Sequence, residues 1–101
     1  MAREEKFAKA VLRIAGAQAN GVASYRRCRA EMANHVNLTL ADLAPSGTRP
    51  GEPMWHQIVR NIKSHSHDEG NFIHEGLLEH VPRVGYRITN AGRVRLKAID
   101  A

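Results

Sequence analysis

Residues 54–65 read MWHQIVRNIKSH, and this stretch decides the fold that we expect. Its apolar side chains recur at i, i+3, i+4 and i+7: Trp55, Ile58, Val59 and Ile62. That spacing is typical of an amphipathic helix with one face against a core. The opposite face carries no acidic residue, only Gln57, Arg60 and Ser64, flanked by His56, Asn61 and Lys63. The stretch therefore predicts a helix with a donor-rich outer face.

Downstream of this helix, two short apolar runs predict a β-hairpin over about residues 77–88. The runs 77–81 and 85–88 read as strands that are joined through Pro82-Arg83-Val84. Thr89 is then placed to cap a closing helix over 90–99, whose apolar side chains are Val94, Leu96 and Ile99.

Upstream, the same periodicity predicts three further helical segments, over 4–18, 25–36 and 40–44. The first carries Phe7, Val11, Ile14 and Gln18 on one face, and Asn20-Gly21 stops it. A short extended link, Val22-Ala23, leads to Ser24, which is placed to cap the second helix. The apolar stripe of that helix is Tyr25, Cys28, Met32 and Val36.

The third segment begins at Thr39, a predicted N-cap with Asp42 three residues further on as an imperfect capping box. Residues 45–53 hold three Pro and two Gly and are predicted to be a loop. These elements together predict a single domain over 1–101 that is mainly α with a small β-hairpin. Their order is that of a winged helix-turn-helix, with 54–65 as the recognition helix and 77–88 as the wing.

Composition points to an anionic partner. The chain has 101 residues and a net charge of +5, with 15 Lys and Arg against 10 Asp and Glu. One domain of this length leaves little room for a closed catalytic cleft. A small basic domain most often binds nucleic acid or an anionic surface. Neither an apolar run long enough for a membrane span nor a signal peptide is visible. The lone Cys28 suits a reducing compartment, so we expect a cytoplasmic protein.

The outer face of 54–65 therefore predicts double-stranded DNA as the partner. Arg makes bidentate contacts to guanine, and Gln or Asn to adenine, so Arg60 is the predicted main base reader and Gln57 and Asn61 are secondary. Arg83 and Arg87 in the wing, and Thr48 and Arg49 before the helix, are expected to contact phosphates. The arginines of 25–36 fit either solvent or the DNA backbone. The predicted DNA-binding set is Arg60, Gln57, Asn61, Ser64, His56, Lys63, Thr48, Arg49, Arg83 and Arg87.

Several blocks of the chain resemble the N-terminal winged-helix domain of Mrr-type restriction endonucleases over roughly residues 7–97. They are Leu38-Thr39, Asp42-Leu43, Pro45-Ser46-Gly47, Trp55, Gly76-Leu77-Leu78-Glu79 and 85–93, Gly-Tyr-Arg-Ile-Thr-Asn-Ala-Gly-Arg. The resemblance implies DNA targeting for a restriction system, with a separate nuclease domain or protein as partner. It leaves open whether a modified base is read. This chain departs from the pattern by a longer segment between 65 and Gly76, and it lacks an Asp…Glu-x-Lys nuclease motif.

Other chemistries are less well supported by the sequence. His65, His67, Asp68 and His74 lie within ten residues, but structural zinc sites use Cys pairs or a His pair one helical turn apart. Ser64-His65 and Ser66-His67 are adjacent in sequence, which is not the spatial arrangement of a catalytic triad. We therefore expect no enzyme activity, no cofactor and no metal. The alternatives are a free-standing transcription regulator, which shares the DNA prediction, and a protein-interaction adaptor that binds no DNA.

Overall fold

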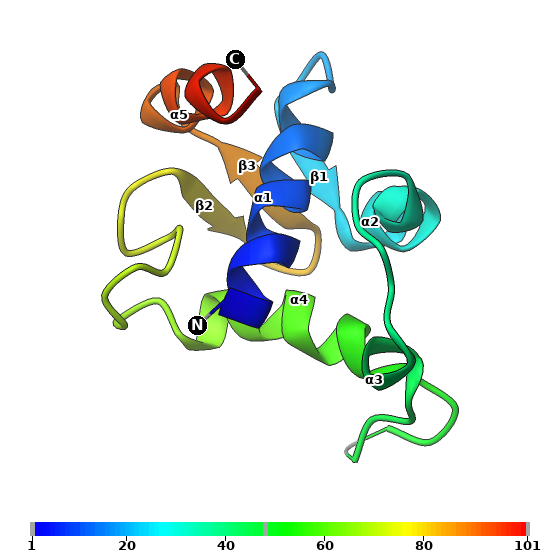
Figure 1. Cartoon of the computed structure of the whole chain (residues 1–101). Helices are drawn as coiled ribbons and strands as arrows, with labels where there is room; N and C mark the ends of the chain where they lie inside the picture. The colour runs from blue at the N-terminus through cyan, green and yellow to red at the C-terminus, as the bar shows by residue number, and fades with distance from the viewer. Residues whose placement is uncertain (1, 48, 101) are drawn as a thin grey trace.

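The computed structural model describes residues 2–47 and 49–100, and these form five α-helices and a three-stranded antiparallel sheet (Figure 1). In chain order the elements are α1 (Ala2–Gly16), β1 (Val22–Ser24), α2 (Tyr25–Glu31), the 3-10 helix η1 (Met32–Asn34), α3 (Leu40–Leu43), α4 (Met54–Ser64), β2 (Leu78–Val81), β3 (Gly85–Ile88) and α5 (Asn90–Asp100). The prediction of a mainly helical chain with a small hairpin is confirmed. None of the described helices combines the length and the apolar character needed to cross a membrane.

The sheet has one strand more than the sequence predicted. Its order is β1-β3-β2, with Val22 opposite Arg87 and Leu78 opposite Ile88. The segment expected to be a mere link, Val22-Ala23, is thus an edge strand that completes its hydrogen bonds on β3. Gly85 makes this pairing possible, because a Cβ there would lie 2.1 Å from the Ala23 carbonyl oxygen.

Helix α1 is the centre of the core. Phe7, Val11 and Ile14 are fully buried, as the periodicity predicted. In Figure 1 α1 runs in front of the sheet, with its N-terminal end near α4 and its C-terminal end near α5. The helix ends at Gly16 rather than at 18. The side-chain amide of Gln18 donates through Nε2 to the Ile14 carbonyl at 3.0 Å.

The predicted caps begin their helices where expected, but two helix lengths were wrong. Ser24 accepts a hydrogen bond from the Arg27 amide, and Thr39 and Asp42 form a complete capping box. The α-helix after Ser24 ends at Glu31 and tightens into η1, instead of continuing to 36. The helix after Thr39 stops at Leu43 because Ala44 adopts an extended backbone.

Asp42 does more than cap α3. Its side chain is 1% exposed, and its carboxylate pairs with Arg3 at 3.0 Å and with Lys6 at 2.8 Å. Burial by itself raises the pKa of Asp42, but the hydrogen bonds from Lys6, Thr39 and Arg3 outweigh it and hold the pKa well below its usual range. This carboxylate therefore ties α3 to the N-terminal half of α1.

The orientation of α5 separates its three apolar residues. Thr89 caps the helix, as its hydroxyl accepts from the Gly92 amide at 2.9 Å. Gly92 lies so close to the hairpin that a Cβ would be 2.2 Å from the Leu77 carbonyl oxygen. Because Leu96 and Ile99 follow at i+4 and i+7, they share the face of Gly92 and pack on the core. Val94, the third apolar residue predicted for this helix, points the other way and is 70% exposed.

Candidate nucleic-acid interface

Helix α4 is held by its apolar face, as the sequence predicted. Trp55, Val59 and Ile62 are buried, and Ile58 is partly buried against them. The Trp55 ring stacks on Phe7 of α1, with centroids 6.2 Å apart. Because this apolar face is buried, the polar side of α4 faces away from the core.

Arg60, the predicted main base reader, is held in an ion pair. Its Nη2 lies 2.7 Å from Oε1 of Glu52, and the two side chains are only 23% and 16% exposed. The hydrogen bond from Arg60 lowers the pKa of Glu52 below its ordinary value, against the opposing effect of burial. Glu52 stands two residues before α4, outside the range 54–65, so its pairing with Arg60 was not predicted from the pattern of that helix.

The two secondary base readers also have partners on the protein. Gln57 accepts a hydrogen bond from the Ser46 hydroxyl at 2.6 Å, which connects α4 to the loop before it. Asn61 is partly buried and lines a small cavity with Ile58 and His65. Both amides are consequently less open to solvent than the helix pattern indicated.

The C-terminal half of α4 is the more open half. Lys63 and Ser64 are exposed, as expected. His56 near the other end is half-buried and packs edge-on against the Trp55 ring. Burial lowers the pKa of His56, so this side chain is better suited to contact as a neutral ring than as a cation.

Of the two residues predicted to bind phosphate before the helix, Arg49 is described and Thr48 lies outside the described residues. The Arg49 side chain is 64% exposed, and its Nη1 is 4.0 Å from Oε2 of Glu52. Arg49 therefore lies beside the Glu52–Arg60 pair while keeping most of its surface in solvent.

The hairpin presents its two arginines differently. Arg83 is exposed at the turn with a positive φ of 66°, a backbone conformation unusual for a non-glycine residue. The Tyr25 amide donates to the Val84 carbonyl at 2.7 Å, which places the turn next to the start of α2. Arg87 alternates with the buried Tyr86 and so projects from the opposite face of the sheet, where Glu79 is its cross-strand neighbour. The structure does not bring Arg87 to the α4 side.

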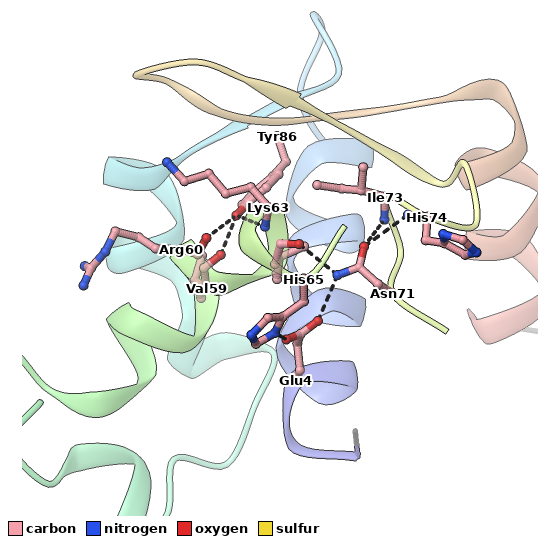
Figure 2. A network of polar contacts seen from close by, with 10 residues as sticks. Glu4, Val59, Arg60, Lys63, His65, Asn71, Ile73, His74 and Tyr86 are labelled. Carbon is pink, nitrogen blue, oxygen red and sulfur yellow. Dashed lines mark hydrogen bonds and ion pairs between the residues drawn. The ribbon is translucent and has the colours of Figure 1, made fainter. Parts of the chain in front are cut away.

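Polar groups from the hairpin and from the 65–76 segment fix α4 from behind (Figure 2). The buried Tyr86 hydroxyl donates to the Val59 carbonyl at 2.5 Å and accepts from the Lys63 amide at 3.3 Å. These two backbone groups are four residues apart, so the tyrosine of β3 joins one full turn of the helix. This role of Tyr86 was not predicted from the sequence, although a Tyr inside an apolar strand usually needs a polar partner.

Asn71 forms the second part of this network. Its side chain is 5% exposed and donates to the Ile62 carbonyl at 2.8 Å and to Glu4 at 3.0 Å. The same Glu4 carboxylate pairs with Nδ1 of His65 at 2.5 Å (Figure 2). The segment between 65 and Gly76 thus anchors the C-terminal end of α4 to α1.

These contacts give the histidine-rich segment a structural use. His65 is paired with Glu4, while His67 and His74 are exposed. Within residues 2–47 and 49–100, no three His, Cys, Asp or Glu side chains come together in a way that could hold a metal ion.

Burial raises the pKa of the Cys28 thiol to about 12, in keeping with its predicted place in the core.

Charge is distributed unevenly over the molecule. Arg29, Arg49 and Arg60 line one cavity of about 150 Å³ between α2 and α4. Lys63 is exposed in the last turn of α4, and Arg83 is exposed at the hairpin turn, which meets the start of α2. We call these five residues the basic surface. A different cavity of about 250 Å³ lies at the start of α1. Its lining includes Arg95 and the acidic side chains Glu4, Glu5, Asp68, Glu69 and Glu75.

Comparison with known proteins gives no relative. None of the protein-family models, curated proteins or solved structures matches the chain. The resemblance to Mrr-type domains therefore stays a prediction.

Proposed function

We propose that the chain is a winged helix that binds double-stranded DNA, with α4 in the major groove and the turn of the β2–β3 hairpin on the backbone. The order α1-β1-α2, then α4, β2, β3, and the sheet order β1-β3-β2 support this arrangement. The basic surface is the observation that carries the proposal. It joins α2, the loop before α4, α4 and the hairpin turn, which are the elements that a winged helix lays along a duplex.

The individual contacts follow from exposure. Lys63 and Ser64 are open at the C-terminal half of α4, and both can donate to phosphates or to base edges. Arg29 on α2, Arg49 in the loop before α4 and Arg83 at the hairpin turn are exposed as well and are suited to phosphates. Arg60 reaches a base edge only by leaving Glu52. Arg87 faces away and has no part in this proposal.

The Tyr86 and Asn71 contacts supply what such an interface needs. Because the hairpin is hydrogen-bonded to the backbone of α4, the distance between Lys63 and the turn is set by the core and not by flexible side chains. A rigid spacing of this kind lets a helix and a wing meet the groove and the backbone together.

The proposal is tested by fluorescence anisotropy on a labelled duplex of about 20 bp. If Arg29, Arg49, Lys63 and Arg83 neutralise about four phosphates, the affinity should fall roughly a hundredfold between about 50 and about 200 mM salt. Arg83→Gln should weaken the slope of log K against log salt by about 0.9. Arg95→Gln removes the same charge beside the acidic cavity and is the matched control.

Two outcomes would contradict the proposal. Absence of duplex binding at low salt would favour the adaptor that binds an acidic protein. Equal losses for Arg83→Gln and Arg95→Gln would show that net charge alone attracts the DNA.

The resemblance to Mrr-type domains extends this proposal to a restriction system that works in the cytoplasm. In that role a separate nuclease domain or protein would cut at the site that this chain selects. The same assay with a cytosine-methylated duplex tests the extension. A preference for the methylated duplex supports it, and a requirement for two symmetric half-sites would favour a dimeric transcription regulator instead.

A further inference from the structure

An acidic residue lies within the basic surface. Glu52 is surrounded by cationic or titratable side chains: Arg60 at 2.7 Å, Arg49 at 4.0 Å, and His56. A carboxylate in this place repels the phosphates that the surrounding arginines attract. Glu52 therefore weakens the attraction of this surface for DNA.

The loop holds Glu52 firmly at the start of α4. Its carbonyl accepts from the Ser46 amide at 2.7 Å, and the Met54 amide donates to the Ala44 carbonyl at the same distance. Pro45 and Pro53 form an antiparallel bridge, which closes the loop on itself. The backbone that carries Glu52 is thus fixed beside α4, and the ion pair with Arg60 holds its carboxylate there.

The pair changes what Arg60 can do. A carboxylate and a phosphate oxygen accept the same guanidinium donors, so Glu52 occupies a place that DNA would otherwise take. Both side chains are partly covered, and a pair with little access to water is weakened less by salt than an exposed one. Guanine presents two acceptors, O6 and N7, in the plane of the guanidinium, so a correctly placed base can replace the Oε1 contact that Glu52 makes.

We propose that Glu52 is a specificity-determining residue of the DNA surface, because it withholds Arg60 from phosphates and so lowers the affinity for DNA of arbitrary sequence. The inference rests on the proposed function. It makes Arg60 a residue that contributes to binding only where a base edge can replace the carboxylate.

The test is Glu52→Gln on a duplex of arbitrary sequence. Glu5→Gln is the matched control, because it removes the same charge from an ion pair, with Lys9 at 3.4 Å, on α1 away from the basic surface. Releasing Arg60 for one more phosphate should raise the affinity of Glu52→Gln roughly tenfold at about 0.1 M salt and steepen the salt slope by about 0.9. The control should change the affinity by less than about twofold.

A second variant covers the case in which Glu52→Gln does not fold. The double variant Glu52→Gln/Arg60→Gln, which removes the pair without changing the net charge, should bind arbitrary DNA within about twofold of the wild type, because the paired Arg60 contributes nothing there. A loss as large as that of Lys63→Gln would overturn the inference. So would a Glu52→Gln protein that binds no tighter than Glu5→Gln while the wild type binds DNA. If neither the wild type nor any variant binds a duplex, the proposed function fails and the inference with it.

Discussion

Replacing Asp42 by Asn should destabilise the fold by an amount that depends on pH. The carboxylate is 1% exposed and interacts with Arg3, Lys6 and the Thr39 amide. Hydrogen bonds to charged groups contribute about 1.5–3 kcal/mol each when buried. The Arg3 and Lys6 side chains are 44% and 36% exposed, however, so water screens both pairs, and Asn also avoids the cost of burying a charge.

We therefore expect Asp42→Asn to lower the free energy of unfolding by about 1–2 kcal/mol at pH 7. Asp42→Ala should cost about 1 kcal/mol more, because it also removes the acceptor for the Thr39 amide. The sign of the pH dependence follows from the lowered pKa of Asp42 in the folded state. Its contribution is present above the unfolded pKa of about 3.9 and is lost as the pH falls toward the folded pKa.

Urea unfolding followed by the fluorescence of Trp55, the single tryptophan, measures both quantities. The gap between the wild type and Asp42→Asn should be constant from pH 7 to about pH 5 and should shrink as the pH is lowered toward about 2. The other carboxyl groups titrate in both proteins and cancel in the difference. Equal stability of the two proteins at pH 7, or a gap that widens in acid, would refute the reasoning.

Two further substitutions test the packing around the hairpin. Gly92→Ala should destabilise the protein by more than about 2 kcal/mol in thermal melting, despite the better helix propensity of Ala, because its Cβ would lie 2.2 Å from the Leu77 carbonyl oxygen; a raised melting temperature would contradict this. Tyr86→Phe should cost only about 1 kcal/mol in urea unfolding, since Val59 and Lys63 can pair with each other once the hydroxyl is gone. A loss above about 3 kcal/mol would mean that these backbone groups stay unpaired.

The sequence was informative where structure depends on local signals. Trp55, Val59 and Ile62 repeat at helical spacing, and a helix of that pattern buries them in almost any compact fold. Ser24 and Thr39 cap helices through bonds that span three residues, so their effect is visible in a short window. The hairpin is local as well, because its two strands are separated by only a short turn.

The errors arose where distant segments decide the outcome. Strand β1 is only three residues long, and it exists because β3, more than sixty residues away, supplies its hydrogen bonds. Val94 belongs to the same apolar set as Leu96 and Ile99, but the close approach at Gly92 sets the rotation of α5 and leaves Val94 in solvent. The orientation of Arg87, in contrast, could have been predicted from local sequence. Strand alternation with the apolar neighbours Tyr86 and Ile88 already indicated that Arg87 faces away from the core.

The outer face of α4 shows why a helix pattern is an incomplete guide to a charged surface. An arginine side chain is long enough to reach past the end of its helix, so the residues that flank a helix belong to its electrostatic environment. Here Glu52 precedes α4 and still engages Arg60, in the second half of that helix. The open donors are therefore those toward the C-terminal end, Lys63 and Ser64. Any duplex that binds this surface should therefore contact Lys63 and Ser64 directly, and Arg60 only after a base edge has replaced Glu52 as its partner.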